Sequence, residues 1–325
     1  MVLAQSLLWS LRMTRPEHGS HGALDRLAAS LVASSLALAT SPAQAIITRH
    51  DVADAEYVVA DADYPALVDL FEPGDCLGSV VAPDALLTVA HCAVDLALGD
   101  PLVVAGELRH VVEVVLHPDW TDRDVDDIAI VRLDAPVTVA PLALYRGASE
   151  VGQPVTLLGR GVTATGLDGE PGADSDGQLR RATNVVSDAT QELLEIRFAA
   201  PEDDDVTDFE GVGAAGDSGG PLFIRVAGAT QIAGLNAFGE GNGVAIGQYG
   251  SSDYQTRVGS YLPWIEGLVE LPEPPASPPG DATQPTPLGC SMRPARDAGA
   301  GAGWLLLLVV AGVTGTRRCR ARRGS

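Results

Sequence analysis

The sequence of 325 residues contains no lysine, so all 21 of its basic side chains are arginines. Acidic residues number 43, and the formal net charge is -22. A nucleic-acid-binding protein needs a basic surface that displaces counterions from phosphates, so this composition argues against that class of partner. The length allows one large domain or two modest ones, with a sizeable core.

Basic residues are scarce in the middle of the chain and gather at its ends. Residues 46–289 hold 11 of the 21 arginines but 40 of the 43 acidic residues. Near the N-terminus, the uncharged apolar run Leu27–Ala39 follows three arginines and precedes Ala43-Gln44-Ala45. A basic flank, an apolar run and a small-residue tripeptide in this order are typical of a signal peptide, whereas a core helix would need none of these flanks. We predict a signal peptide over residues 1–45, removed by signal peptidase.

The other end has the features of a membrane or sorting segment. Residues 271–289 are rich in proline and predict an extended linker. Beyond Cys290, residues 298–316 carry no charge, and five arginines follow. This order resembles the C-terminal sorting signals of myxobacterial surface proteins (the MYXO-CTERM type). The resemblance implies cleavage near Cys290 by a sorting protease, with lipid attachment to Cys290; a plain membrane anchor is the alternative.

Cysteine is also scarce, with four residues in the chain. Cys290 and Cys319 belong to the tail, which leaves Cys76 and Cys92 in the body. An even pair in an oxidising compartment predicts one disulfide. A zinc site is the alternative, but only His91 lies close enough in sequence to add a ligand to the two cysteines. We predict no cofactor and no catalytic metal.

The body between these ends has the pattern of a β protein without internal repeats. Short β-rich runs separated by glycine, aspartate and proline predict an all-β barrel or sandwich. The runs are His110–His117, Ile128–Leu133, Pro154–Gly159, Leu193–Phe198, Pro221–Val226 and Gln231–Phe238. Helical periodicity is found mainly in Tyr261–Val269, where Leu262, Ile265, Leu268 and Val269 share a face.

The hexapeptide Gly216–Pro221 (GDSGGP) contains the candidate nucleophile Ser218. A serine hydroxyl needs a base to take its proton, and the glycines allow backbone amides to converge on one negative oxygen. A plain glycine-rich turn is the alternative. The same residues fit the nucleophile elbow of α/β-hydrolases, but there the histidine follows the serine. No histidine follows His117 in this chain, which argues against that class.

Histidine and aspartate candidates for the base and its partner lie upstream. His91 comes at the end of an apolar strand and directly before Cys92, whereas His110 and His117 flank a strand as surface residues. Asp127 precedes the apolar strand Ile128–Leu133, where it can orient an imidazole. Asp126 is adjacent, but strand alternation points it the other way.

Three motifs in this order, TVAHC (Thr88–Cys92), DIAIVRL (Asp127–Leu133) and GDSGGP (Gly216–Pro221), resemble those of the chymotrypsin-like (trypsin-type, S1) serine peptidases. The resemblance covers residues 46–270. It implies an all-β fold of two six-stranded antiparallel β-barrels with a C-terminal helix, and an active site in the cleft between the barrels.

The resemblance also implies roles for individual residues. Ser218 attacks the peptide carbonyl, His91 acts as general base and then as acid, and Asp127 holds His91. The backbone amides of Gly216 and Ser218 form the oxyanion hole.

Two further features follow from the same resemblance. Cys76 and Cys92 match the family disulfide beside the catalytic histidine. Ile46, freed by cleavage after Ala45, pairs its amine with Asp217 and thereby activates the enzyme. Signal peptidase would then be the activating protease.

The substrate pocket departs from the family pattern. Val212 occupies the place where Arg/Lys-specific relatives carry an aspartate, which favours a pocket for apolar or small side chains and leaves the substrate preference open. Ala237-Phe238-Gly239 replaces the usual Ser-Trp-Gly edge, and the alanine removes a hydroxyl that normally supports the catalytic aspartate. Asp253 is expected on another wall, where it would select a basic side chain, or else in an exposed loop. The expected pocket residues are Val212, Gly213, Ala237, Phe238, Gly239 and Asp253.

Together these features predict an exported serine endopeptidase that acts on polypeptide substrates. It would be displayed at the cell surface or outer membrane through its C-terminal segment, or released to the extracellular space. A non-catalytic binding module on the same fold and an α/β-hydrolase-type esterase are the alternatives. An acidic loop with Asp119, Asp122 and Asp124 is a candidate structural calcium site, the alternative being a solvated loop.

Overall fold

The computed structural model describes residues 46–121 and 125–272 of the chain. The predicted signal peptide, most of the linker, the sorting segment with Cys290, and Asp122 and Asp124 of the acidic loop lie outside the described residues. In the described part, neither helix has the length and apolar character needed to cross a bilayer.

The described residues form mainly short strands. In chain order these are β1 (Ile47–Thr48), β2 (Leu67–Asp69), β3 (Leu77–Ala82), β4 (Ala85–Thr88), β5 (Pro101–Val104), β6 (Glu107–Leu116), β7 (Ala129–Leu133), β8 (Ala143–Leu144), β9 (Pro154–Gly159), β10 (Arg180–Ala189), β11 (Leu193–Arg197), β12 (Gly211–Val212), β13 (Pro221–Val226), β14 (Ala229–Glu240) and β15 (Ser252–Arg257). The helices are α1 (Ala90–Ala93), α2 (Val258–Leu268) and two 3-10 turns, η1 (Asp54–Glu56) and η2 (Asp61–Asp63).

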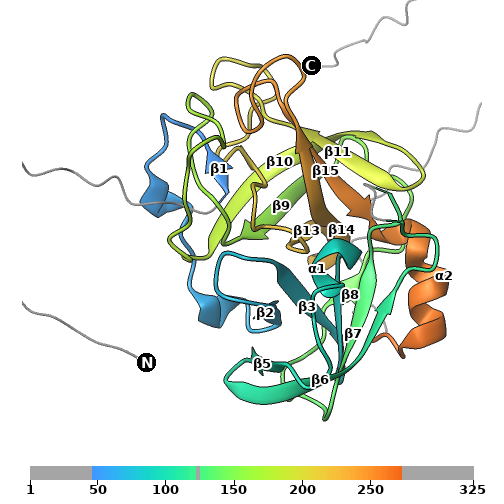
Figure 1. The fold of residues 1–325 in the computed structure, drawn as a ribbon. Coiled ribbons are helices and arrows are strands. Elements are labelled where there is room, and N and C mark those ends of the chain that lie inside the picture. Colours follow the sequence, from blue (N-terminus) through green and yellow to red (C-terminus); the bar gives the residue numbers. More distant parts are fainter. Residues whose placement is uncertain (1–45, 122–124, 273–325) are drawn as a thin grey trace, which may run out of the picture. The chain divides into compact units, whose positions relative to one another are not determined.

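The strands build two antiparallel barrels, one below the other in Figure 1. The first has the order β2-β3-β4-β7-β6-β5 and is nearly closed. The second has the order β13-β9-β10-β11-β15-β14 and closes because β13 pairs with both β9 and β14; β8 adds a short parallel pairing to β14. The predicted two six-stranded barrels are confirmed. The α/β-hydrolase alternative is wrong, because that class needs a mostly parallel sheet covered by helices.

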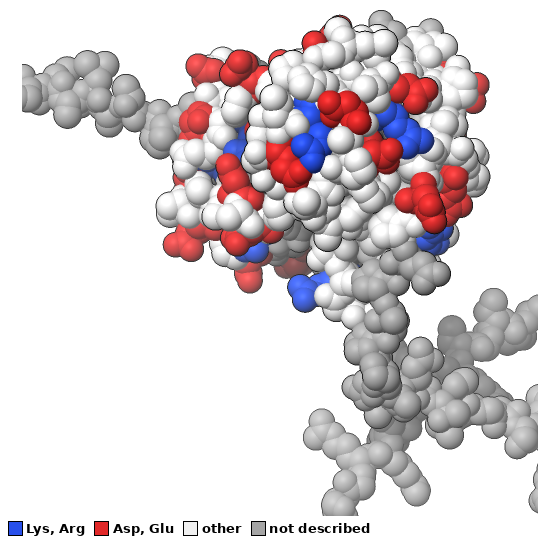
Figure 2. Space-filling model, turned by 90° about the horizontal axis from the view of Figure 1, so that it is seen from below, with Lys and Arg blue, Asp and Glu red and all other residues white. Residues whose placement is uncertain are grey.

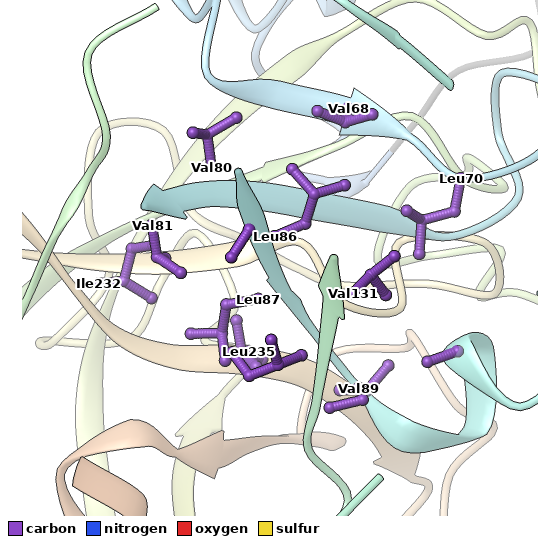
Figure 3. Close-up of a cluster of buried hydrophobic side chains, with 14 of the residues drawn as sticks. Val68, Leu70, Val80, Val81, Leu86, Leu87, Val89, Val131, Ile232 and Leu235 are labelled. Atoms are coloured by element: carbon purple, nitrogen blue, oxygen red, sulfur yellow. The ribbon is translucent and has the colours of Figure 1, made fainter. Parts of the chain in front are cut away.

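The core of the first barrel is built by strands whose apolar residues are buried along their whole length. Leu86 of β4 lies between Val80 of β3 and Val131 of β7, and all three are fully buried, as is the next residue, Leu87. Figure 3 shows Leu235 of β14 beside them, so a strand of the second barrel contributes to this core. Burying each such leucine contributes about 1.5–3 kcal/mol, which fixes the strand that leads into His91.

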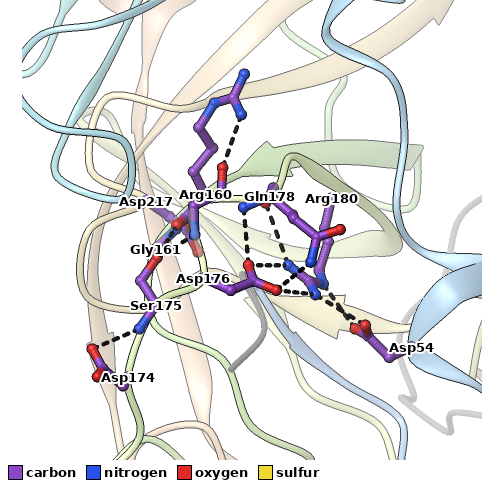
Figure 4. Close-up of polar contacts among 10 residues, drawn as sticks. Asp54, Arg160, Gly161, Asp174, Ser175, Asp176, Gln178, Arg180 and Asp217 are labelled. Atoms are coloured by element: carbon purple, nitrogen blue, oxygen red, sulfur yellow. Dashed lines mark hydrogen bonds and ion pairs between the residues drawn. The ribbon is translucent and has the colours of Figure 1, made fainter. Parts of the chain in front are cut away.

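All six predicted strands are present, but the sequence pattern missed others, among them β3, β5 and β15. The longest missed strand is β10. Its residues RRATNVVSDA are largely polar, and their burial alternates along the strand. Arg180 at its start is fully buried because it binds two carboxylates, Asp54 and Asp176, with both pairs drawn in Figure 4. A charge with that many partners can occupy a core position that the pattern assigns to apolar residues.

The C-terminal helix is confirmed with a shifted boundary and a shifted face. α2 begins at Val258, three residues earlier than predicted, directly after β15. Its buried residues are Val258, Tyr261 and Ile265, whereas Leu262 is only partly buried. Tyr261 lies inside, in the same buried cluster as the core of the first barrel, together with Ile265 and Val269 of the predicted face.

Acidic side chains outnumber arginines on the face of the molecule shown in Figure 2. Because acidic residues are in excess, two of the arginines each form ion pairs with two carboxylates. Arg160 pairs with Asp61 and Asp69, as Arg180 pairs with two aspartates.

Candidate active site

His91 lies in α1, directly after β4, and its ring is bound to Asp127. The Nδ1 atom lies 2.6 Å from Oδ2 of Asp127, and the backbone amide of His91 donates to Oδ1 at 2.8 Å. The His91 side chain is 36% exposed, whereas that of Asp127 is almost completely buried. The same carboxylate therefore orients both the ring and the backbone of His91.

Asp127 is positioned from both barrels. It lies just before β7 of the first barrel, and its carbonyl oxygen accepts a hydrogen bond from the Thr256 hydroxyl of β15 at 2.8 Å. A carboxylate at Nδ1 favours the tautomer with the proton on that nitrogen, which leaves Nε2 free to accept one. The carboxylate of Asp126 instead accepts a hydrogen bond from the Tyr261 hydroxyl, because Asp126 lies in a turn before β7 and not in the strand.

The loop that carries Ser218 packs tightly against the chain entering β3. The amides of Cys76 and Leu77 donate to the carbonyl oxygens of Gly216 and Ser218 at 3.0 and 2.8 Å. Gly219 has φ +77°, and a Cβ there would lie 2.1 Å from the carbonyl oxygen of Leu77. Only glycine fits this close approach.

Two backbone amides of this loop are left without a protein acceptor. The N–H groups of Asp217, Gly219 and Gly220 donate to backbone carbonyls. Among the described residues, neither Gly216 N–H nor Ser218 N–H donates to any group of the protein. Unpaired amides on both sides of Asp217 are the donor set that an oxyanion needs.

The predicted disulfide between Cys76 and Cys92 is confirmed, with Cα atoms 6.1 Å apart. It joins the chain that binds the Ser218 loop to the residue after His91. A ring nitrogen of His91 and the Sγ atoms of Cys76 and Cys92 lie within 4.8 Å of one another. Bonded sulfurs are not thiolates, so the zinc alternative for these cysteines is wrong.

Ser218 and His91 thus lie on segments that are tied together by backbone hydrogen bonds and a disulfide. The Ser218 hydroxyl makes no hydrogen bond to His91 within residues 46–121 and 125–272. Hydrogen bonds between catalytic groups are often long without substrate and tighten in the complex.

Asp217 is buried behind the serine, beside the chain that follows the predicted cleavage site. Its carboxylate accepts hydrogen bonds from Gly161 N–H at 2.6 Å and Ala214 N–H at 2.9 Å; Figure 4 shows its contact with Gly161. Burial raises the pKa of Asp217 to about 7, although backbone N–H groups, including that of Ile46, act to lower it. Ile46 is 1% exposed.

A cavity of about 260 Å³ opens beside Ser218. Its lining consists of small residues, two apolar side chains and three polar groups: Gly213, Ala214, Ala215, Ser218, Ala237, Gly239, Phe238, Ile246, Glu170, Asn236 and Asp253. Five of the six expected pocket residues are among them. Val212 instead lies in the buried cluster around Ile47, its β1 partner.

Asp253 lies in the wall of this cavity and is 2% exposed. Its carboxylate accepts hydrogen bonds from Gly213 N–H at 2.8 Å, from the Asn236 amide at 3.1 Å and from the Gln255 amide at 2.9 Å. Burial, with the charge of Asp217 as a further cause, raises the pKa of Asp253 to about 7. The carboxylate is a pocket group, not an exposed loop residue.

The family model described as Trypsin matches residues 57–265, more than half of the chain. The chain belongs to the trypsin family. It is 29% identical to a trypsin of Saccharopolyspora erythraea over 217 residues, 61% of this chain and 90% of the relative. It is 32% identical to brachyurin of Leptuca pugilator over 216 residues, 59% of this chain and 86% of the relative.

Vitamin K-dependent protein C of Rattus norvegicus is 27% identical over 227 residues, which are 60% of this chain but 46% of that relative. The chain therefore spans about half the length of protein C. Membership of the trypsin family and these relatives indicate a serine-type endopeptidase.

Within this trypsin-family domain, two other histidines have different surroundings. His110 is exposed and contacts Asp134, as expected for a surface residue. The prediction that His117 is a surface residue is wrong: its side chain is 11% exposed. It packs edge-on against Tyr261 and Trp264, because α2 covers the end of β6.

The cavity residues that were not expected from the sequence are Ala214, Ala215, Glu170, Asn236 and Ile246. Glu170 accepts a hydrogen bond from Ala215 N–H at 2.6 Å, across 45 residues of chain. Asn236 fills the space beside Gly213, where a Cβ would lie 1.7 Å from the Asn236 amide nitrogen. These contacts leave no local signal in the sequence.

Proposed function

We propose that the chain is an exported serine endopeptidase that hydrolyses peptide bonds with Ser218, His91 and Asp127. The observation that carries this proposal is the paired hydrogen bonding of Asp127 to the ring and backbone of His91. The unpaired amides of Gly216 and Ser218 support it.

In the proposed mechanism, Ser218 Oγ attacks the carbonyl carbon while His91 Nε2 takes the hydroxyl proton. The carbonyl oxygen becomes negative and accepts hydrogen bonds from the amides of Gly216 and Ser218. Collapse expels the amine, which receives the proton from His91 and leaves an acyl-enzyme. Water then attacks the carbonyl carbon of the ester while His91 takes its proton, and collapse releases Ser218, which receives that proton from His91. Asp127 stays ionised throughout and stabilises the imidazolium.

Labelling with a fluorophosphonate tests whether Ser218 is an active nucleophile. We expect labelling of the exported protein that is lost in Ser218→Ala and His91→Ala. The matched control is Ser187→Ala, whose hydroxyl bonds only the carbonyl of Glu195. An unlabelled wild-type protein favours the alternative of a non-catalytic binding module.

The proposed activating event is cleavage after Ala45, which turns the amide of Ile46 into an amine. Ile46 is already buried, and its N–H acts on Asp217. A positive amine there would pair with the buried carboxylate and hold the Ser218 loop. N-terminal sequencing of active protein is the direct test, and a start other than Ile46 removes the idea.

The cavity beside Ser218 is proposed to receive the substrate side chain before the scissile bond. Its volume of about 260 Å³ leaves room for a side chain. Asp253 at the wall has donors on Oδ2 at 2.8 to 3.1 Å, while among the described residues its Oδ1 accepts only from Asn236 at 3.3 Å. The weakly bonded Oδ1 favours a basic side chain, with which it can form a charge-assisted hydrogen bond.

Export and surface anchoring remain our proposal from the sequence of the two ends. Cys290 is the proposed processing and lipidation site, acted on by a sorting protease. Cell fractionation of wild type and Cys290→Ser tests this: we expect membrane or surface association that the variant loses. Equal partition of both proteins removes the role of Cys290.

A further inference from the structure

The carboxylate of Asp127 has few hydrogen-bond donors around it. In the described part of the chain it accepts hydrogen bonds from His91 alone, and no side-chain hydroxyl supports it. The position of this carboxylate therefore depends on how the backbone around residue 127 is fixed. One fixing contact is the Thr256 hydroxyl at the carbonyl oxygen of Asp127.

The neighbouring residue Asp126 has an unusual backbone conformation. Its φ is +57°, in the left-handed region that residues other than glycine, asparagine and aspartate rarely enter. The amide of Ile128 donates to the carbonyl oxygen of Asp126 at 2.9 Å, so Asp127 lies at the centre of a tight turn. A change in the backbone conformation of Asp126 would therefore move Asp127.

The side chain of Asp126 is tied to the C-terminal helix. The Tyr261 hydroxyl donates to Oδ1 of Asp126 at 3.1 Å, across 135 residues of chain. Nδ1 of His117 lies 3.9 Å from the same oxygen. His117 packs edge-on between Tyr261 and Trp264, with ring centroids 5.1 and 5.0 Å apart, which holds the tyrosine ring in place.

We propose that Tyr261 and Asp126 form a brace that positions Asp127 for its work on His91. The inference rests on the proposed function. In this proposal, helix α2 affects the reaction through the hydrogen bond from the Tyr261 hydroxyl to Asp126. Asp126 and Tyr261 are positioning residues, because neither touches the reacting atoms, and His117 supports them by packing.

The experiment compares Tyr261→Phe, Asp126→Gly and Asp126→Asn in the mature protein. Tyr261→Phe keeps the ring and removes the hydroxyl, and Asp126→Gly keeps the backbone conformation and removes the carboxylate. Asp126→Asn keeps both an acceptor oxygen and the left-handed tendency. The matched control is Tyr57→Phe, since that buried hydroxyl donates to the carbonyl of Glu210 and accepts from Arg49 N–H, so it bonds neither Asp126 nor Asp127.

Rates are expressed per active site, counted by fluorophosphonate titration. We expect kcat to fall about 3- to 10-fold in Tyr261→Phe and in Asp126→Gly, the size of one hydrogen bond, with KM unchanged. The double variant should be no slower than either single one, and Asp126→Asn and Tyr57→Phe should stay within about 2-fold of wild type.

Two results overturn the brace. One is a kcat per active site equal to wild type in Tyr261→Phe, with only the melting temperature lowered, which means a purely structural contact. The other is Asp126→Asn as slow as Asp126→Gly, which means that the acceptor is not what matters. Failure of the wild type to label at all is a different outcome, since it removes the proposed function itself.

Discussion

Asp217 and Asp253 are bound by two consecutive backbone amides. Ala214 N–H donates to Asp217 at 2.9 Å, and Gly213 N–H donates to Asp253 at 2.8 Å. One carboxylate faces Ile46 and the other lies in the wall of the cavity beside Ser218. Both are buried, and the charge of Asp217 raises the pKa of Asp253. The charge of Asp217, beside the chain start, therefore acts on a carboxyl in the wall of the pocket.

Stability should fall as pH rises through the range in which this pair ionises. In the form that still carries the residues before Ile46, the pKa of each carboxyl is raised from 3.8 to about 7, so the folded state binds more protons than the unfolded state between these values. The contribution of these carboxyl groups to the free energy of unfolding is complete below pH 3.8 and is lost as pH passes about 7. Asp253→Asn removes one such group, so its melting temperature should fall less than that of the parent between pH 4 and 8.

Thermal unfolding in a Ser218→Ala background measures this without self-digestion. The matched control is Asp208→Asn, an exposed residue that makes no hydrogen bond in the described part of the chain. Parallel pH curves for the parent and Asp253→Asn contradict the prediction.

The identity of the first residue should decide activity. In a form that begins at Ile46, the N-terminal amine belongs to Ile46 and lies next to Asp217. In a form that keeps Ala45, the N-terminal amine belongs to Ala45, one residue away. An unpaired member of a buried charge pair costs roughly 3–5 kcal/mol, so kcat/KM of the longer form should be at least about 100-fold lower. Both forms can be made by cleaving an engineered leader, and equal rates exclude the activation pair.

Substrate preference should depend on Asp253. Peptide p-nitroanilides with Arg at the cleaved position should be hydrolysed faster than those with Leu. Asp253→Asn should lower kcat/KM for Arg about 10- to 100-fold, the value of a hydrogen bond to a charged group, and change it little for Leu. Glu170→Gln is the matched control, because it changes another carboxylate of the same cavity. If Glu170→Gln lowers kcat/KM for the Arg substrate more than Asp253→Asn does, Glu170 and not Asp253 selects the basic side chain.

Asp127→Asn should keep the fold and lose most of the activity. An asparagine amide favours the wrong tautomer of His91, and the expected loss in kcat is about 10⁴-fold. Steady-state kinetics with circular dichroism of the same sample checks this. A loss below 10-fold shows that another group orients His91.

The disulfide should contribute to both stability and rate. Its loop of 17 residues is worth about 3 kcal/mol in the chain-entropy model. Cys76→Ala with Cys92→Ala should lower the free energy of unfolding by that amount. It should also lower kcat, since Cys92 follows His91 directly. Urea unfolding and active-site titration measure the two effects, and an unchanged kcat limits the disulfide to stability.

Sequence patterns were sufficient where a residue's role depends on its neighbours in the chain. The strands β9 and β13 were predicted with correct ends, because their apolar runs are bounded by prolines and glycines. β10 was missed, because the partners that allow Arg180 into the core lie at Asp54 and Asp176, the first of them 126 residues away.

The sequence by itself determined the β class, the cysteine pair, and which histidine, aspartate and serine to examine, since these follow from local pattern and motif order. Only the tertiary structure decided that Asp253 is a buried pocket acid, that Val212 is not in the pocket, and that His117 and Tyr261 pack behind Asp127. The physical reason is that burial and hydrogen-bond partners arise where distant strands meet. No local stretch of the chain specifies them.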